Sequence, residues 1–284
     1  MVSSTPTFNA RLKNNKIPER FLLSVKWWLQ DETHHLVQNT SWFNCIEPMR
    51  HSKGIGFTAT PIRGDKKGLG RHSDGVFDEL SVTTNMFTLI KDGMLTPYKI
   101  YTTGMFDVKN CNVTSNGDYN QKKLAIGVNK RDIIGDAVGH YQKLINGAPA
   151  ITFCVNIEHA KAVADQFNEA GIRSIAISSK SDLKERQQAM EDFRAGRIIN
   201  LVNVDLLGEG YDCPAVTAVI MLRPTQSYSL FKQQFGRMLR NSDGKAAGLL
   251  LDHVGNTQYF MEKYGLSAPH DDPEWTLDRV DNRK

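Results

Sequence analysis

From residue 150 onward, short apolar runs alternate with longer stretches that are apolar on one side only. The runs have the length of strands and contain many β-branched residues, which predicts strands at 150–155, 172–177, 198–204, 215–222 and 248–252. Between the first three runs, apolar positions recur at helical spacing over 158–170 and 183–193. This β-α-β-α-β order predicts a parallel sheet with right-handed crossovers.

The pattern is less regular before residue 150. Phe21 to Leu29 is an apolar run that predicts a buried strand, and a second apolar entry leads into a polar turn at 58–61. A short helix is predicted at 87–93 and a longer one at 132–145, where apolar residues recur at helical spacing. Residues 108–120 are rich in Asn, Ser and Gly, which predicts a loop. The predicted fold class is α/β.

Composition narrows the class of protein. The 284 residues have room for one large domain or two ordinary ones, and 40% hydrophobic with 23% charged residues is typical of a soluble globular protein. A net charge of +4 is compatible with binding to phosphate backbones. The four cysteines are widely spaced without a Cys-x-x-Cys, which favours reduced thiols over a zinc ribbon or a disulfide framework. No apolar run has the length of a membrane span and no signal peptide is evident, so we expect a cytoplasmic protein without membrane partners.

Two carboxylates follow the first predicted strand directly. Asp31 and Glu32 come after Phe21 to Leu29, and ligands of parallel sheets bind at the carboxyl ends of strands. Asp31 is suited to hold Mg²⁺ through water, and Glu32 to orient or deprotonate an attacking water. An exposed acidic turn is the alternative for an Asp-Glu pair taken alone.

Two arginines lie on a predicted helix near the end of the chain. Arg237 and Arg240 are three residues apart, which places both guanidinium groups on one face of a helix. Two such groups suit a multiply charged anion such as a triphosphate. A basic surface helix is the alternative for these arginines taken alone.

These segments together resemble the sequence motifs of superfamily 2 helicases. Asp31-Glu32-Thr33-His34 resembles the DExH box of motif II, and Thr58-Ala59-Thr60 resembles motif III. Cys154-Val155-Asn156 is similar to motif IV, Gly210-Tyr211-Asp212 to motif V, and residues 233–240 to the Gln-x-x-Gly-Arg-x-x-Arg of motif VI. The doubled histidine after Asp31-Glu32 resembles a phage and bacterial subgroup related to type III restriction subunits.

The resemblance implies ATP and Mg²⁺ as cofactors and DNA as partner, with RNA left open. It assigns the chemical step to Asp31, Glu32, His34, Arg237 and Arg240, with Mg²⁺ on Asp31 through water. It assigns nucleotide binding to Gly210, Asp212, Gln233, Arg237 and Arg240. It assigns coupling to Thr58 and Thr60, and nucleic-acid contact to Asn156, Ser178 and Asn203. For Ser178, an ordinary polar loop explains the sequence equally well.

The implied architecture has two RecA-like domains. Residues 1–110 form a truncated first domain with motifs II and III, and 146–256 form a complete second domain with motifs IV to VI. Residues 111–145 form a linker and connecting helix, and 257–284 a C-terminal tail.

One element of nucleotide chemistry does not occur in the sequence. Hydrolysis requires a Gly-x-x-x-x-Gly-Lys-Ser/Thr loop (Walker A) that binds the phosphates, and the 284 residues contain none. In the family this loop precedes motif II, but only about thirty residues precede Asp31, too few for the strand, loop and helix required. We therefore expect a first domain whose parallel sheet lacks strands and has an exposed edge.

Three functions are compatible with this sequence. The chain is expected to be the C-terminal part of an ATP-dependent helicase or translocase, inactive alone, whose Walker A half is a separate chain or has been lost. Alternatively, it is a nucleic-acid-binding module without turnover, or a non-catalytic subunit that supplies arginine fingers to a partner ATPase. If the chain is phage-encoded, the compartment is the host cytoplasm.

Overall fold

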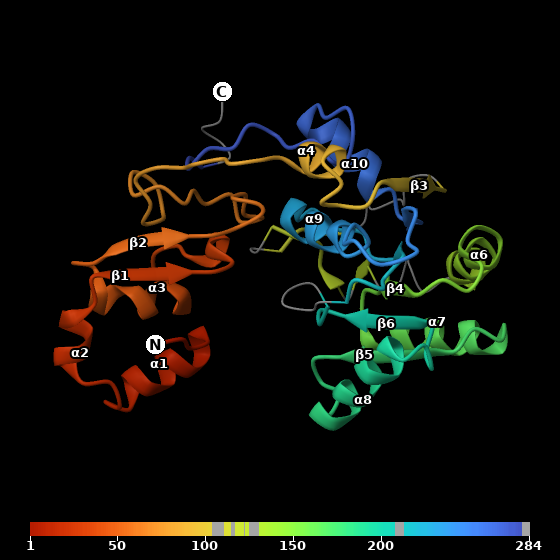
Figure 1. Ribbon diagram of the computed structural model, residues 1–284, viewed down its shortest axis with the longest axis horizontal. Coiled ribbons are helices and arrows are strands. Elements are labelled where there is room, and N and C mark those ends of the chain that lie inside the picture. Colours follow the sequence, from red (N-terminus) through yellow and green to blue (C-terminus); the bar gives the residue numbers. More distant parts are fainter. Residues whose placement is uncertain (104–110, 115–116, 122, 125–130, 208–212, 280–284) are drawn as a thin grey trace. The chain divides into compact units, whose positions relative to one another are not determined.

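The computed structural model describes residues 1–284 except 104–110, 115–116, 122, 125–130, 208–212 and 280–284. Contacts divide the chain into two compact units (Figure 1). The first unit contains residues 1–82 and 274–284, and the second contains 83–273. The division therefore falls earlier than the predicted limit at residue 110. The described part of the chain contains no helix long and apolar enough to cross a membrane.

The second unit is built on a six-stranded parallel sheet, which confirms the predicted α/β class. Its strand order is β3-β8-β7-β4-β6-β5, with every neighbouring pair parallel. The strands are β3 (Tyr98–Thr102), β4 (Ala150–Phe153), β5 (Ser174–Ser178), β6 (Asn200–Val204), β7 (Ala218–Met221) and β8 (Gly248–Asp252). All residues of the central strands β4, β6 and β7 are buried, as expected for a sheet covered on both faces.

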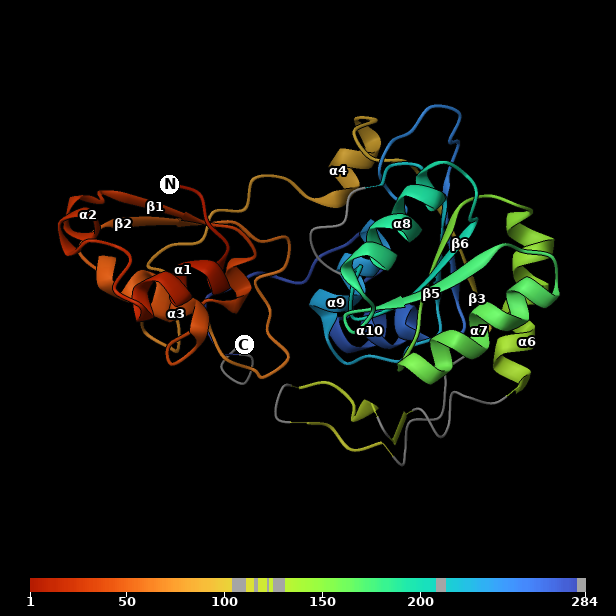
Figure 2. The same ribbon diagram turned by 90° about the horizontal axis from the view of Figure 1, so that it is seen from below.

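Helices cover both faces of this sheet. Figure 2 shows α6 (Arg131–His140) and α7 (Ile157–Glu169) on one face and α9 (Tyr228–Gly236) and α10 (Asn256–Tyr264) on the other. The π-helical turn Tyr141–Ile145 continues α6, and α8 (Leu183–Arg194) connects β5 to β6. A short helix, α4 (Met86–Lys91), precedes β3. The helices predicted at 87–93, 132–145, 158–170 and 183–193 are confirmed, whereas α10 was not anticipated.

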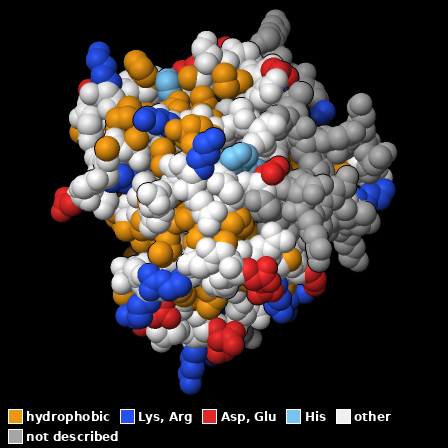
Figure 3. All heavy atoms as spheres, turned by 90° about the vertical axis from the view of Figure 1, so that its right-hand side faces the viewer, with side chains coloured by type: hydrophobic (Ala, Val, Ile, Leu, Met, Phe, Trp, Pro, Cys, Tyr) orange, Lys and Arg blue, Asp and Glu red, His pale blue; other side chains and the backbone are white. Residues whose placement is uncertain are grey.

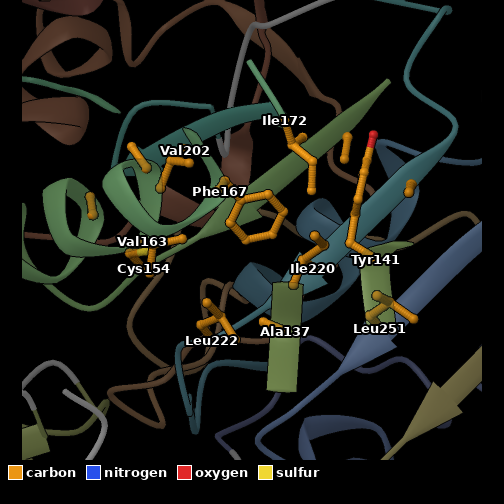
Figure 4. Close-up of a cluster of buried hydrophobic side chains, with 14 of the residues drawn as sticks. Ala137, Tyr141, Cys154, Val163, Phe167, Ile172, Val202, Ile220, Leu222 and Leu251 are labelled. Atoms are coloured by element: carbon orange, nitrogen blue, oxygen red, sulfur yellow. The ribbon is translucent and has the colours of Figure 1, made fainter. Parts of the chain in front are cut away.

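The main hydrophobic core lies between the sheet and α6 and α7. Phe167 of α7 and Tyr141, 0% and 1% exposed, pack edge to face with ring centroids 5.5 Å apart. Around them lie side chains from β7 and β8, including Ile220 and Leu251 (Figure 4). The connecting helix therefore belongs to the core of the second unit.

The sequence places residues 98–102 within the first domain (1–110), but they form strand β3 of the second unit. Tyr98 pairs with Gly248 and Thr102 with Asp252, so β3 completes the large sheet at the β8 edge. Parallel pairing with β8 requires a partner 150 residues away, which a local apolar pattern does not reveal.

The first unit contains a parallel pair of strands and several short helices. The strands are β1 (Trp27–Gln30) and β2 (Lys53–Gly56), paired from Trp27↔Lys53 to Gln30↔Gly56. The helices are α1 (Thr5–Lys13), α2 (Glu19–Ser24), α3 (Ser41–Ile46) and the 3-10 turns Thr33–His35 and Glu47–Met49. Phe8, Cys45 and Met49 form its small core.

The prediction of a buried strand at Phe21 to Leu29 was wrong in extent and in burial. The first half of the run forms α2, and β1 begins only at Trp27. Trp27 and Leu29 are 58% and 69% exposed, because they share a face of β1 that the two-stranded sheet leaves open. Among the described residues the sheet of this unit has two strands.

Candidate functional site

The acidic pair lies immediately after the carboxyl end of β1. Asp31 is exposed, and its Oδ1 accepts the backbone N–H of Glu32 at 2.8 Å. Glu32 has a left-handed backbone conformation with φ of 49°, which is uncommon for a residue other than glycine. Such conformations concentrate at functional sites, because the surrounding structure must hold them in place. The pair therefore lies where the sequence predicted it.

A histidine joins the acidic turn to the threonine loop that follows β2. His34 is 6% exposed, and its Nδ1 lies 3.1 Å from Thr58 Oγ1 and 3.4 Å from Glu32 Oε2. Thr58 Oγ1 also accepts the backbone N–H of Thr60 at 3.1 Å. The side chains of His34 and Thr58 thus connect the acidic turn to the threonine loop, so movement of one loop would displace the other.

Arg63 and Asp65 form a salt bridge that supports this connection through the backbone of His34. Arg63 donates to the carbonyl oxygen of His34 at 2.5 Å and forms a two-pronged ion pair with Asp65 at 2.8 and 2.6 Å. Burial alone raises the pKa of Asp65, but the hydrogen bond and charge of Arg63 outweigh it and lower that pKa below its ordinary value. Asp65 is therefore charged at neutral pH and fixes Arg63 against the motif II backbone.

The two motif VI arginines do not lie on one helix face, which corrects the sequence prediction. The helix α9 ends at Gly236, Arg237 caps it, and Arg240 follows in an irregular segment. Arg237 is 8% exposed, whereas Gln233 and Arg240 are half-buried. The helix ends early because the chain turns here to enter the sheet at β8, where a Cβ on Gly248 would lie 2.5 Å from the Met238 carbonyl oxygen.

The segment that carries Arg240 is fixed by tertiary hydrogen bonds. Lys245 Nζ donates to the Arg240 carbonyl oxygen at 2.7 Å, and Thr96 donates through its N–H to Leu239 at 2.7 Å and through Oγ1 to Arg240 at 3.2 Å. Burial lowers the pKa of Lys245 to about 8. These contacts set the position of the Arg240 backbone without a helix.

Two residues predicted to contact nucleic acid have structural roles inside the second unit. The Asn156 side chain accepts the backbone N–H of His159 at 2.7 Å and caps α7. Asn203 is 1% exposed, its Nδ2 donates to the Thr152 carbonyl oxygen at 3.1 Å, and its Oδ1 accepts the N–H of Leu207 at 3.3 Å. The amide of Asn203 is therefore used inside the domain, which differs from the predicted contact with nucleic acid.

Ser178 also bonds within its own turn. It is 6% exposed, its N–H donates to Ser181 Oγ at 3.1 Å, and its Oγ accepts the N–H of Lys180 at 3.2 Å. These local bonds are typical of a serine that shapes a turn. Ser178 therefore shapes a polar turn, which is the alternative that the sequence left open. Gly210 and Asp212 lie outside the described residues.

Sequence reasoning missed a charged cluster at the carboxyl edge of the sheet. Arg223, 7% exposed, follows β7 and forms ion pairs with Asp205, which follows β6, and with Asp118 at 3.4 Å. Gln121 Nε2 donates to the other oxygen of Asp205 at 2.9 Å. The signal in the sequence was the arginine that ends the apolar run at 215–222, but its acidic partners are distant in the chain.

The donor set of the acidic turn is compatible with Mg²⁺. Within the described ranges no three His, Cys, Asp or Glu side chains are grouped to hold a metal ion. Mg²⁺ is commonly bound by one or two carboxylates together with water and substrate phosphates, so the exposed carboxylate of Asp31 fits it without further protein ligands.

A central parallel sheet between two helical layers, with polar turns at its carboxyl edge, is the architecture of RecA-like nucleotide-dependent domains. Residues 130–242 match the family described as helicase conserved C-terminal domain. The chain therefore contains a helicase conserved C-terminal domain, in agreement with the resemblance of its motifs.

Relatives and solved structures are similar to more of the chain. It is 34% identical over 244 residues to a 51.5 kDa protein of a Lactococcus phage (isolate 7-9), across 86% of this chain and 51% of that protein. It is 30% identical over 248 residues to a protein named as a candidate mitochondrial ATP-dependent helicase, Irc3, of Schizosaccharomyces pombe, across 85% and 40%. The chain thus spans about half, or less, of the length of these relatives.

Two solved structures share the fold. A fragment described as an HsdR subunit of a type I restriction enzyme from Vibrio vulnificus matches with a TM-score of 0.64 and 21% identity, across 90% of this chain and 47% of that one. Dbp5 of S. cerevisiae, bound to RNA and ADP BeF3, matches with a TM-score of 0.57 and 17% identity, across 97% and 64%.

Proposed function

We propose that this chain is part of an ATP-dependent nucleic-acid helicase or translocase, acting on DNA. The observation that carries the proposal is the acidic pair after β1, connected through His34 to the threonine loop, in a chain that also contains a helicase conserved C-terminal domain. The relative from S. pombe is named an ATP-dependent helicase, which supports the use of ATP here. A cytoplasmic location, in the host if the chain is phage-encoded, is part of the proposal.

In this function the chain's own residues would divide the chemical work. Asp31 would hold Mg²⁺ through water, and that ion would neutralise charge on the nucleotide phosphates when bound. Glu32 would orient the attacking water and accept its proton, with His34 holding the carboxylate in place. Gln233 would contact the nucleotide, as would Gly210 and Asp212. Arg237 and Arg240 would stabilise negative charge in the transition state.

The phosphate loop must come from outside these 284 residues, since the sequence contains no Gly-x-x-x-x-Gly-Lys-Ser/Thr. We propose that a segment bearing this loop completes the nucleotide site, either within the same polypeptide or as a partner chain. Thr58 would then couple the site to movement, because its hydroxyl contacts the motif II histidine directly. Thr60, whose N–H bonds Thr58, would act with it.

The test compares ATP hydrolysis by this chain alone with hydrolysis after fusion to, or co-expression with, a segment that bears the phosphate loop. We expect no turnover from the chain alone and turnover from the complemented protein, abolished by Glu32→Gln. That substitution removes the proton acceptor and leaves the shape intact. Turnover by the chain alone, abolished by Glu32→Gln, would refute the need for an external loop. An active complemented protein that is insensitive to Glu32→Gln would refute the assigned role of Glu32.

The second candidate is a nucleic-acid-binding module without turnover, which the absent phosphate loop favours. Complemented protein that binds DNA but never hydrolyses ATP would support this alternative. On the side of the second unit drawn in Figure 3, the described Lys and Arg side chains are scattered rather than gathered into one patch. Among the described residues on that side, therefore, no single basic patch marks a surface for nucleic acid.

A further inference from the structure

An acidic side chain occupies a pocket built for an anion beside the carboxyl edge of the large sheet. Asp118 Oδ1 accepts the backbone N–H of Gln226 at 2.8 Å, and its Oδ2 lies 3.4 Å from the guanidinium of Arg223. Gln226 lies just before Ser227, the residue that caps α9, a helix of nine residues. A guanidinium fork and an N–H near a helix N-terminus are the groups that bind phosphate and carboxylate groups in proteins.

The pocket itself is fixed by the core. Arg223 lies two residues after the fully buried strand β7 and is 7% exposed, with a buried Nε that has no hydrogen-bond partner. It also borders a separate small cavity lined by Asn203 of β6 and Gln234 of α9, which neither Asp118 nor Gln226 lines. Burying a guanidinium is costly unless it is paired, so an anion is required at this position.

The anion that fills the pocket comes from a part of the chain that is distant in sequence. Asp118 is 105 residues before Arg223, and next to it Tyr119 packs in a cluster with two other buried side chains, Leu124 and Val155. The carboxylate of Asp205 supplies the remaining charge from the end of β6. A cationic site filled by a carboxylate from a distant part of the chain is one where another anion can compete with that carboxylate.

We propose that Arg223 and the N–H of Gln226 bind a backbone phosphate of nucleic acid, and that Asp118 occupies this site when nucleic acid is absent. The proposal rests on the nucleic-acid function proposed above. It is favoured by position, because Arg223 lies at the carboxyl end of β7, the edge where parallel sheets bind ligands. This site would also provide a contact with nucleic acid in place of the one predicted for Asn203, whose amide is directed into the domain.

The experiment measures binding of the full chain to a fluorescein-labelled oligothymidylate of about 20 nucleotides, longer than one binding site. Asp118→Asn keeps an acceptor for Gln226 N–H but removes the competing charge. Asp192→Asn is the matched control, because Asp192 also pairs with an arginine, Arg197, but lies on α8. Both variants change net charge equally, so general electrostatic attraction to the oligonucleotide cancels in the comparison.

We expect Asp118→Asn to tighten binding about tenfold relative to Asp192→Asn, the worth of one charge-assisted hydrogen bond. Adding Arg223→Gln to Asp118→Asn should remove this gain. If that double variant does not fold, Arg223→Lys in the same background should reduce the gain, because an ammonium lacks the planar fork. Equal affinities of the two aspartate variants, or a gain that survives loss of Arg223, would overturn the proposal.

A second arm separates nucleic acid from free nucleotide. ADP affinity is measured for the same variants and should be unchanged by Asp118→Asn. A gain in ADP affinity without a gain in oligonucleotide affinity would assign the site to nucleotide phosphate and overturn the nucleic-acid assignment. If neither the natural chain nor any variant binds the oligonucleotide, the proposed nucleic-acid function itself fails, whereas binding by all variants with equal affinity refutes only the Arg223 site.

Discussion

At the scale of single residues, the polar side chains of this protein divide into those that shape loops and those left available for chemistry. Asn156 and Ser178 bond within their own turns, and Asn203 bonds to the backbone of β4 and of the segment after β6. Asp31 is exposed at the end of its strand, and Arg240 is half-buried in a segment held by tertiary bonds. Substitutions of the Arg240 side chain leave these tertiary bonds in place, because they are accepted by its backbone carbonyl oxygen.

The first prediction concerns Arg240 in the complemented ATPase. An arginine that stabilises transition-state charge contributes about 10³–10⁵ in rate, so Arg240→Ala should lower kcat strongly and nucleotide affinity little. Arg240→Lys should fail nearly as badly. Steady-state kinetics provide the measurement. Arg197→Ala is the control, because Arg197 forms an exposed ion pair on the same unit and should leave kcat unchanged. If Arg240→Ala retains most of its turnover, motif VI is only a basic segment.

The second prediction concerns pH and the buried His159. It is 0% exposed, and burial lowers its pKa from 6.5 to about 4. Between these values the unfolded chain binds the proton more readily, so the free energy of unfolding should fall as pH falls, by at most about 1.4 kcal/mol per pH unit from this residue. Denaturant titrations at about pH 7 and 5 should show a flatter dependence for His159→Gln. Replacing the exposed His51 by Gln should leave the slope unchanged.

At the scale of elements, the sheet of the first unit has one apolar face open. Leu29 and Ile55 are paired in register and are 69% and 43% exposed, and Trp27 and Phe57 beside them are 58% and 55% exposed. A contiguous apolar face on a parallel pair of strands favours association, since each side chain gains about 1.5–3 kcal/mol on full burial. The exposed apolar face of β1 and β2 and the outer edges of this sheet therefore both favour association with another protein surface.

The third prediction is that this face drives self-association of the isolated chain. The double variant Leu29→Lys, Ile55→Lys should reduce concentration-dependent association in sedimentation experiments. Leu23→Lys, a similar change at a leucine of α2 that is 64% exposed, serves as the control and should associate like the natural chain. Equal association of all three proteins would show that another surface is responsible.

The limits of the second unit give the fourth prediction. A fragment of residues 83–273 contains β3 and the connecting helix and should unfold cooperatively. A fragment of residues 146–273 lacks Tyr141, 1% exposed in the core, and the loss of a buried aromatic side chain costs about 3–5 kcal/mol. Thermal melts should therefore show a much less stable shorter fragment. Equal stability of the two fragments would favour the limit at residue 146.

At the scale of the whole molecule, the fifth prediction concerns the net charge and its effect on binding to nucleic acid. A net charge of +4 without a dominant basic patch on the face in Figure 3 predicts weak, sequence-tolerant binding to nucleic acid. Affinity should fall several-fold between about 50 and 200 mM salt, as expected when even a few counterions are released. Fluorescence titrations over this range provide the measurement. Binding that is insensitive to salt would indicate recognition through uncharged contacts instead.

The sequence by itself determined the alternation of strands and helices after residue 150, because hydrophobic periodicity is a local property of the chain. It also placed the carboxylates of Asp31 and Glu32 at the end of β1, because both residues directly follow that strand in the sequence. It did not determine the length of α9, which ends at Gly236 because the chain must turn into β8.

Only the tertiary structure decided which distant groups meet. The pairing of β3 with β8 joins segments 150 residues apart, and Asp118 reaches Arg223 across 105 residues. No local pattern encodes such contacts, because they depend on how the sheet orders its strands and on which loops pack above its edge. For the same reason Asn203, a polar residue beside a motif, was expected to face a ligand, whereas burial turned its amide to the domain's own backbone.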